Sequence, residues 1–357
     1  MKVGILTFHR AYNYGAILQA YALQEKLFEN DVQSEIIDYL STEKKKQNKL
    51  FSYNKSLGMK GNILKFLKDF YRKKKNKTFD RFMKDYMVVS DRSYATFDEL
   101  VQLDQQNKYD TYIVGSDQVW NFNNTLNDPV FLLKFTSDNK KKCSYAASIG
   151  NAEFDDKMYN QYKNELGTFR ILTVREDSAI KKFGFLRENH ARVAVDPTLL
   201  LEKSIYESLS SPRILNKKYA FMYTIAGERN LRKFARNYCK QNGLVLIDSK
   251  KSKIFFQNAS PEDFLSFIQY AECVFTNSFH GTALSIVMEQ QFFTEVHTKT
   301  KVNYRSDDLI NKLGLQDRDI DCNTFDSKKR IDYREVNKEL KILRDRSMEI
   351  LKEIIMK

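Results

Sequence analysis

A single histidine stands where an apolar segment ends and a helix-like segment begins, in the sequence CVFTNSFHGTALSIVMEQ at residues 273–290. The free amides and the positive dipole end of a helix N-terminus favour an anion at such a turn. A histidine beside that anion can contact a phosphate and exchange a proton near neutral pH. We therefore predict a catalytic acid at His280 and an anion site at Ser278, Gly281 and Thr282. A histidine with a purely structural role is the alternative.

The turn after the first strand-like segment, FHRAYNYGAILQ at residues 8–19, is a second candidate site. Gly15 permits a close approach to the start of the following helix, so we predict substrate binding by His9, Asn13 and Gly15. The turn lacks the GxGxxG pattern and is therefore not a dinucleotide fingerprint. An ordinary turn with aromatic packing fits the same residues.

A third candidate is YIVGSDQVWN at residues 112–121, where an apolar strand ends in polar residues and the only tryptophan. A carboxylate at the end of a strand can accept a proton from a sugar hydroxyl, which predicts a catalytic role for Asp117. We predict that Trp120 stacks on a sugar ring and that Ser116 contacts the substrate. The alternative is an Asx turn with Trp120 in the core.

An arginine ends the strand-like part of ILTVREDSA at residues 171–179. Its planar guanidinium suits a carboxylate or a phosphate because it bonds two oxygens at once. We predict a catalytic role for Arg175 at a bound carboxylate or phosphate. The alternative is a surface ion pair with Glu176 or Asp177.

A repeated pattern of strands and helices must position these turns along 357 residues, a length that suggests two domains. The alternation indicates βαβ units and mostly parallel sheets, and therefore an α/β fold of two Rossmann-like, doubly wound domains. Ligands bind at the carboxyl ends of strands in such folds, so the cleft between the domains is the expected active site. Predicted strands lie at 2–8, 34–39, 110–115, 142–148, 171–175, 191–196, 219–225, 244–248, 273–277 and 292–296, and predicted helices at 15–30, 157–166, 176–183, 228–242, 261–271, 282–289, 305–313 and 332–357.

The predicted domain boundaries follow from the restart of this pattern near residue 196. Residues 1–196 form an N-terminal domain with a basic helical insertion at 41–90. Residues 197–331 form a C-terminal domain, and residues 332–357 a final charged helix.

The net charge of +13 is concentrated in residues 41–85, which hold fifteen Lys or Arg against four Asp or Glu. Apolar residues recur there at helical spacing, around 63–71 and again around 79–86, which predicts two amphipathic helices with a basic outer side. An acidic membrane surface suits this segment. Nucleic acid is not a predicted partner because no RNA-binding or recognition-helix pattern accompanies the charge.

The four cysteines lack the spacing of a metal site or a disulfide framework, which favours buried thiols in a reducing compartment. No Asp, Glu and His cluster has ligand spacing, so we predict neither a metal nor another cofactor. The chain has no apolar run of membrane-spanning length, and its N-terminus resembles a strand rather than a signal peptide. We expect a cytoplasmic protein with peripheral contact at the inner face of the membrane.

Six motifs together resemble the polysaccharide pyruvyl transferase family, and in chain order they cover most of the sequence. This resemblance implies two Rossmann-like domains in the GT-B arrangement, with a C-terminal helix that crosses back to the first domain. It also implies transfer of the enolpyruvyl group of phosphoenolpyruvate to a sugar of a surface polysaccharide, or of its lipid-linked precursor, as a pyruvate ketal. The motifs are ILTFHRAYNYGAILQAYALQ, YIVGSDQVWN, SYAASIG, VREDSA, VDPTLLL and TNSFHGTALS.

The resemblance matches His280 to the histidine of the family and Arg175 to an arginine suited to the donor. The chain departs from the pattern at Ser278, where many members carry an arginine. A serine cannot supply the missing charge, so either donor binding is weaker or another cation replaces the arginine. We favour Arg305, which opens a helix and resembles an arginine of a subgroup of the family. The first turn departs as well, since Gly15 is followed by alanine where members have Gly-Asp. The candidate cations are Lys299, Lys301 and Arg305.

Two other functions are compatible with these observations. A nucleotide-sugar glycosyltransferase can have the same fold, since fold does not determine function. A non-enzymatic protein that docks on membranes through residues 41–85 is the second.

For the transferase that the family resemblance implies, the predicted partners are phosphoenolpyruvate and an oligosaccharide or lipid-linked glycan acceptor.

Overall fold

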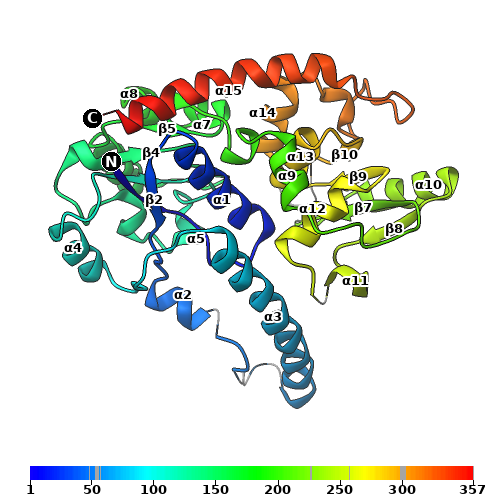
Figure 1. Ribbon diagram of the computed structural model, residues 1–357, viewed down its shortest axis with the longest axis horizontal. Helices are drawn as coiled ribbons and strands as arrows, with labels where there is room; N and C mark the ends of the chain where they lie inside the picture. The colour runs from blue at the N-terminus through cyan, green and yellow to red at the C-terminus, as the bar shows by residue number, and fades with distance from the viewer. Residues whose placement is uncertain are drawn as a thin grey trace.

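Two Rossmann-like domains lie side by side, each built on a parallel sheet with helices packed around it (Figure 1). The computed structural model describes residues 1–47, 49–52, 56, 58–225, 227–256, 258–297 and 303–356. The predicted α/β architecture is confirmed. The exact residue boundaries of the domains stay a prediction.

The first domain contains a four-stranded sheet with strand order β2-β1-β3-β4, in which every neighbouring pair is parallel. Its central strands are apolar and buried because helices cover both faces of a parallel sheet. Isolated β-bridges, Cys143 with Ile171 and Ala147 with Val174, connect the β4 region to a short parallel pair of strands, β5 and β6. The strands are β1 (Lys2–Leu6), β2 (Gln33–Ile36), β3 (Thr111–Val114), β4 (Lys142–Ser144), β5 (Thr173–Val174) and β6 (Arg192–Val193).

The second domain repeats the arrangement with strand order β10-β9-β7-β8, again with parallel pairs only. All ten predicted strands are therefore present in the order expected, although most are shorter than the apolar runs that predicted them. The strands are β7 (Tyr219–Tyr223), β8 (Val245–Asp248), β9 (Cys273–Thr276) and β10 (Phe292–Thr294).

Polar residues mark where several helices begin. The side chain of Asn13 accepts hydrogen bonds from the first amides of α1, and Ser260 with Asp263 forms a capping box at α12. The helices are α1 (Tyr14–Phe28), α2 (Thr42–Gln47), α3 (Gly58–Tyr86), α4 (Phe97–Gln105), α5 (Phe122–Thr125), α6 (Asp156–Leu166), α7 (Asp177–Lys182), α8 (Gly184–Glu188), α9 (Lys203–Leu209), α10 (Leu231–Asn242), α11 (Lys253–Phe256), α12 (Pro261–Gln269), α13 (Phe279–Val287), α14 (Tyr304–Lys312) and α15 (Tyr333–Ile355).

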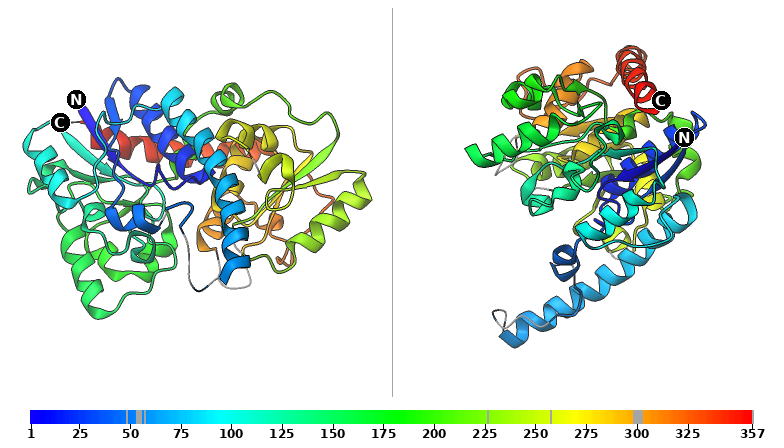
Figure 2. Two further views of the ribbon diagram at one scale, coloured as in Figure 1. Left: turned by 90° about the horizontal axis from the view of Figure 1, so that it is seen from below. Right: turned by 90° about the vertical axis from the view of Figure 1, so that its left-hand side faces the viewer.

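The basic insertion differs from its prediction. The two expected amphipathic helices are one continuous 29-residue helix, α3, because no glycine or proline interrupts residues 62–86. Its C-terminal half packs on the first domain through Phe79, Phe82 and Met83, which are buried. Its N-terminal half projects away from both domains, as Figure 1 and the right-hand view of Figure 2 show.

The last helix, α15, crosses from the second domain to the first (Figure 1). At its start, the hydroxyl of Tyr333 donates to the carbonyl of Gln290 at 2.5 Å. At its end, the guanidinium of Arg170 donates to the carbonyl of Ile354 at 2.7 Å, which satisfies a carbonyl that a helix C-terminus leaves free. The crossing helix that the family resemblance implies is therefore present.

Candidate functional site

A pocket of 380 Å³ opens between the two domains, at the carboxyl ends of the parallel strands. Its walls come from the turns after β1, β2 and β3 on one side and after β7 and β9 on the other. This size and position are typical of small-molecule sites in doubly wound folds. Five of the predicted site residues line the pocket, namely Asn13, Asp117, Ser278, His280 and Arg305.

Two of the predicted turns meet directly across the domain boundary. The ring of His280, from α13, lies against Gly15 at the start of α1. A Cβ atom at Gly15 would lie 2.1 Å from Nδ1 of His280, far inside contact distance. Space, rather than an unusual backbone angle, therefore requires glycine at this position.

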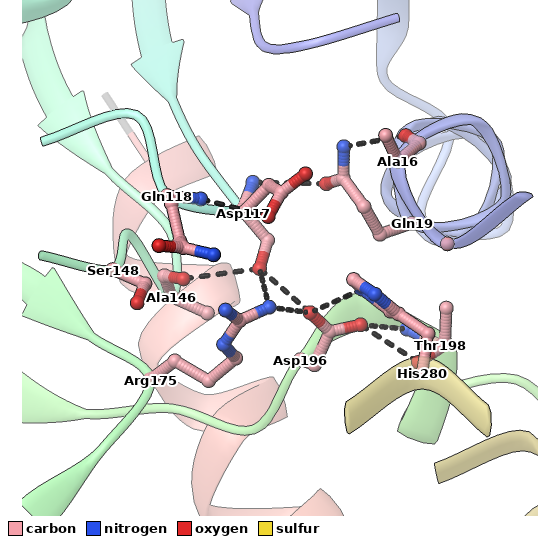
Figure 3. A network of polar contacts seen from close by, with 12 residues as sticks. Ala16, Gln19, Asp117, Gln118, Ala146, Ser148, Arg175, Asp196, Thr198 and His280 are labelled. Atoms are coloured by element: carbon pink, nitrogen blue, oxygen red, sulfur yellow. Dashed lines mark hydrogen bonds and ion pairs between the residues drawn. The ribbon is translucent and has the colours of Figure 1, made fainter. Parts of the chain in front are cut away.

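The carboxylate of Asp196 lies at the centre of a buried polar network beside the pocket (Figure 3). Its Oδ2 is 2.7 Å from Nη1 of Arg175, 2.8 Å from Oγ of Ser116 and 3.4 Å from Nε2 of His280. Thr198 donates to Oδ1 from its amide at 3.0 Å and from its hydroxyl at 2.7 Å. Asp196 is thus a fully buried carboxylate shared by Arg175, Ser116 and His280.

Asp196 remains ionised in this environment. Burial alone raises the pKa of Asp196, but the charges of His280 and Arg175, together with the Thr198 hydroxyl, hold it well below its usual range. The network thus fixes one negative charge behind the imidazole. At 3.4 Å, Nε2 of His280 is within ion-pair distance of this charge but makes no hydrogen bond to it.

Arg175 does not line the pocket, and its side chain is 1% exposed. Nε lies 3.2 Å from Oε1 of Glu176, and Nη1 is held by Asp196. Burial lowers the pKa of Arg175, but these two carboxylates outweigh it and the pKa is raised. The two carboxylates hold Nε and Nη1, and Nη2 is buried without a hydrogen-bond partner among the described residues. The predicted two-oxygen contact with a donor is wrong for this arrangement, because at most Nη2 is left for a ligand. The alternative prediction was an ion pair of Arg175 with Glu176 or Asp177 on the surface. The pair with Glu176 is present, but it is buried.

The helix at the opening turn begins three residues earlier than predicted, at Phe279, because Ser278 caps it. The Ser278 hydroxyl accepts from the amide of Gly281 at 3.4 Å, and the Ser278 carbonyl accepts from the amide of Thr282 at 2.9 Å. The predicted anion site at the amides of Gly281 and Thr282 is therefore wrong. Both residues are buried and do not line the pocket. The amides of Phe279 and His280 have no partner among the described residues.

Arg305, at the start of α14, is a partly buried cation at the edge of the pocket. No carboxylate of a described residue lies within ion-pair distance of its guanidinium. Its Cζ lies 6.0 Å from the ring centroid of Phe279, and that of Arg175 lies 4.4 Å from the same ring. Burial and the charge of Arg175 lower the pKa of Arg305, yet an arginine remains charged at neutral pH. The site therefore holds a cation that a bound anion would stabilise.

The first domain contributes two predicted residues to the pocket. Asp117 follows β3 with a left-handed backbone (φ 67°), and its Oδ1 accepts from the amide of Gln118 at 2.8 Å. Asn13 uses its side-chain oxygen to cap α1, which leaves its amide nitrogen as a hydrogen-bond donor. Both side chains therefore keep polar groups available at the pocket wall.

Three predicted substrate contacts are wrong because these side chains are committed elsewhere. His9 is buried, with Nε2 3.0 Å from Oδ1 of Asp38 and Nδ1 3.2 Å from the carbonyl of Thr7. Ser116 is fully buried and is part of the Asp196 network. Trp120 is fully buried and its indole donates to the carbonyl of Phe131 at 2.9 Å, so neither ring face is open to a sugar.

Two of the proposed cations, Lys299 and Lys301, lie outside the described residues. Four pocket or network residues were missed by the sequence analysis: Arg10, Lys44, Asp128 and Asp196. The two aspartates share one signal, since each precedes a proline and caps a short 3₁₀ helix. That signal indicates a helix start and not chemistry, so it did not identify them.

Within the described ranges, no group of three or more His, Cys, Asp and Glu side chains is arranged to hold a metal ion. None of the helices in the described part of the chain combines the length and the apolar character that a membrane span requires.

Comparison with solved structures finds the same two-domain arrangement in UDP-N-acetylglucosamine 2-epimerases. A protein described as such an epimerase, from Listeria monocytogenes, has 13% identity and a TM-score of 0.50, covering 98% of this chain and 95% of its own. The Methanocaldococcus jannaschii enzyme has 13% identity and a TM-score of 0.49, covering 97% and 93%. At 13% identity the Listeria likeness shows the GT-B fold alone. A comparison with curated proteins found no match.

The profile of the family described as polysaccharide pyruvyl transferase matches residues 13–294. The match begins at Asn13, within the first turn, and covers the buried network and the His280 turn, whereas Arg10 and Arg305 lie outside it. The chain belongs to the polysaccharide pyruvyl transferase family.

Proposed function

We propose that this protein transfers the enolpyruvyl group of phosphoenolpyruvate to two hydroxyls of a sugar and so forms a pyruvate ketal. The acceptor is a sugar of a surface polysaccharide or of its lipid-linked precursor. The proposal rests on the family match and on the chemistry of the pocket between the domains.

The reaction needs an acid, a base and cations. A proton added to C3 of phosphoenolpyruvate makes a methyl group and leaves C2 electrophilic. Two sugar hydroxyls then add to C2 and lose their protons, while the C2–O bond to phosphate breaks. One hydroxyl proton balances the proton given to C3, and the other leaves with phosphate.

The pocket supplies each of these groups. His280 serves as the acid, with its Nε2 3.4 Å from Oδ2 of Asp196. Asp117 serves as the acceptor for a hydroxyl proton. Arg305 and the amides of Phe279 and His280, at the positive end of α13, bind the carboxylate or phosphate of the donor.

The observation that carries the proposal is the cation of Arg305, which has no carboxylate partner among the described residues and lines the same pocket as His280. A partly buried charge of this kind is stabilised when an anionic substrate binds beside it. Phosphoenolpyruvate brings two anionic groups to the site.

A nucleotide-sugar donor fits the second domain less well. In doubly wound folds, the helix N-terminus after the first strand is a typical phosphate site. Here that end of α10 is filled by Glu295, whose buried carboxylate accepts from the amides of Arg229, Asn230 and Leu231 at 2.9, 2.5 and 3.0 Å. A nucleotide phosphate would have to displace this internal carboxylate.

Incubation with phosphoenolpyruvate and a panel of glycosides tests the proposal. Phosphate release and the mass gain of one pyruvate ketal on the acceptor are expected together, and both should vanish in His280→Gln. Release of a nucleoside diphosphate from a nucleotide sugar, with no phosphate released from phosphoenolpyruvate, would establish the glycosyltransferase alternative instead.

A further inference from the structure

The projecting N-terminal half of α3 carries apolar side chains that the protein does not cover. Ile63, Phe66, Leu67 and Phe70 are 57%, 57%, 53% and 48% exposed, and Met59 is 78% exposed. Large apolar residues that gather on one exposed surface mark an interaction site, whereas single ones do not. We call these five residues the α3 stripe.

The α3 stripe does not continue the face by which α3 packs on the first domain. At 3.6 residues per turn, the buried residues Phe79, Phe82 and Met83 lie roughly on the opposite side of the helix from the stripe. The buried side attaches the helix to the protein, and the stripe therefore points away from that attachment. Within the described chain its contacts are few: Phe66 touches the ring of Phe51, Phe70 the ring of the neighbouring Tyr71, and Lys74 lies over the ring of Phe70.

Basic side chains line the helix that carries the stripe. From residue 58 to residue 79 the helix has eight Lys or Arg and only one acidic residue, Asp69. Asp69 is paired with Lys65 at 3.0 Å and lies 3.5 Å from Arg72, and Lys75 packs over the ring of Tyr14 at 4.4 Å. At 3.6 residues per turn, Lys60, Lys73, Lys74 and Lys77 lie on the side of the stripe and give it a positive charge. Long Lys side chains beside an apolar stripe suit a surface whose interior is apolar and whose outer layer is anionic.

We propose that the α3 stripe docks on an anionic lipid bilayer, with its apolar side chains in the interface and its Lys and Arg at the lipid headgroups. A second copy of the helix matches the stripe less well, because two such basic helices would repel each other. A bilayer satisfies both the apolar and the charged side chains. The docking is peripheral, in keeping with a helix far too polar to span the membrane.

The docked helix is connected to the pocket. Asp80, in the attached half of α3, accepts from the hydroxyl of Tyr12 at 3.2 Å and lies 3.9 Å from the guanidinium of Arg10, which lines the pocket. If the proposed function holds, docking brings the pocket near a lipid-linked acceptor. Docking itself is independent of that reaction and is tested without substrate.

A tryptophan placed in the stripe reports docking directly. The native Trp120 is buried and hydrogen-bonded, so its emission should not respond to lipid. In Ile63→Trp, we expect a blue shift of the emission with phosphatidylglycerol vesicles at low salt, quenching by brominated lipid, and reversal at high salt. No shift should occur with phosphatidylcholine vesicles. Equal shifts with both lipids, or none with either, would overturn the proposal.

Co-sedimentation with the same vesicles separates the two components of binding. Ile63→Ser/Leu67→Ser/Phe70→Ser and, separately, Lys60→Gln/Lys68→Gln/Lys74→Gln are each expected to reduce the bound fraction at least tenfold. The matched controls change exposed residues elsewhere, Val245→Ser/Ile342→Ser and Lys338→Gln/Lys341→Gln, and should bind as the parent does. Circular dichroism confirms folding of each variant. A parent that is dimeric in light scattering, becomes monomeric in the serine variant and does not bind vesicles would show that the stripe is a self-association surface.

Discussion

The imidazole of His280 fills the space that a side chain on Gly15 would need, so the two domains are in van der Waals contact at the proposed acid. His280 belongs to the second domain and Gly15 to the first. The position of the acid therefore depends on how the first domain packs against the second, and the pocket is complete only when they are in contact.

A methyl group at position 15 should disturb this contact. We expect Gly15→Ala to fold but to lower kcat/KM by ten- to a hundredfold, because displacing a catalytic group by about 1 Å has that order of effect. Steady-state kinetics with circular dichroism is the measurement. Gly167→Ala, at an ordinary helical φ of −64°, serves as the control and should keep parental activity. Parental kcat/KM in Gly15→Ala would show that the ring moves aside at no cost.

Removal of the imidazole should abolish proton donation without unfolding the chain. We expect His280→Ala and His280→Gln to lower kcat by roughly a hundredfold or more, the usual effect of one acid catalyst. The glutamine variant should keep part of the donor binding, measured as protection from thermal unfolding by phosphoenolpyruvate. His190→Gln, at an exposed histidine, is the control. Near-parental turnover in a folded His280→Gln would make His280 a structural residue.

The charge of Asp196 should matter for both stability and activity. Asp196→Asn keeps the size of the side chain but leaves Arg175 and His280 without their shared counter-charge, a loss of about 3–5 kcal/mol for a buried pair. We expect a lower Tm and a loss of turnover. Asp345→Asn, at an exposed position, should change neither.

The pH dependence of this effect has a definite sign. Because the folded-state pKa of Asp196 lies below its unfolded value of about 3.9, its stabilising contribution is present in full above that value. It is lost as the pH falls further. The difference in Tm between the parent and Asp196→Asn should shrink as the pH falls below about 4, because protonated Asp196 carries no more charge than the asparagine. A difference that grows below about pH 4 would contradict this assignment.

Arg305 should act on donor binding more than on the chemical step. Arg305→Gln is expected to raise the KM for phosphoenolpyruvate at least tenfold, since one charge-assisted contact with an anion contributes about 1.5–3 kcal/mol. Arg305→Lys should recover part of the loss because it restores the charge without the planar fork. Arg334→Gln, at an exposed arginine, is the control. An unchanged KM in Arg305→Gln would remove Arg305 from the donor site.

Turnover should not require a divalent ion. Arg305 and the backbone amides of Phe279 and His280 are proposed to bind the anionic donor without a metal. Activity is therefore expected to survive treatment with a chelator. Loss of activity with the chelator and recovery with magnesium would refute this expectation.

The order and type of the main elements could be predicted because buried parallel strands are apolar runs that end in polar turns. The position of the site at the strand ends follows from the same pattern. The sequence pattern predicts a start of α13 at residue 282, three residues too late, because Ser278 is the N-cap. That error misplaced the anion site, since the amides of Gly281 and Thr282 are inside the first turn.

Long-range contacts account for the remaining errors. Asp196 meets a serine 80 residues earlier in the chain, and no local pattern reveals such a partner. For Arg175 and Trp120, the sequence shows that each follows a strand but not whether its side chain turns towards the cleft or towards the core. Both turn inward, where Glu176 and Asp196 accept from Nε and Nη1 of Arg175 and the Phe131 carbonyl accepts from the indole of Trp120.

The crossing of α15 has a consequence for synthesis on the ribosome. The amide of Val195 donates to the hydroxyl of Ser347 at 3.0 Å, and Arg170 reaches the last carbonyls of the helix, so the first domain depends on a segment translated long after its own strands. Domains generally fold in order as they emerge. Here the first domain must wait, partly uncovered, until the second has been made and residues 333–355 return to cover it.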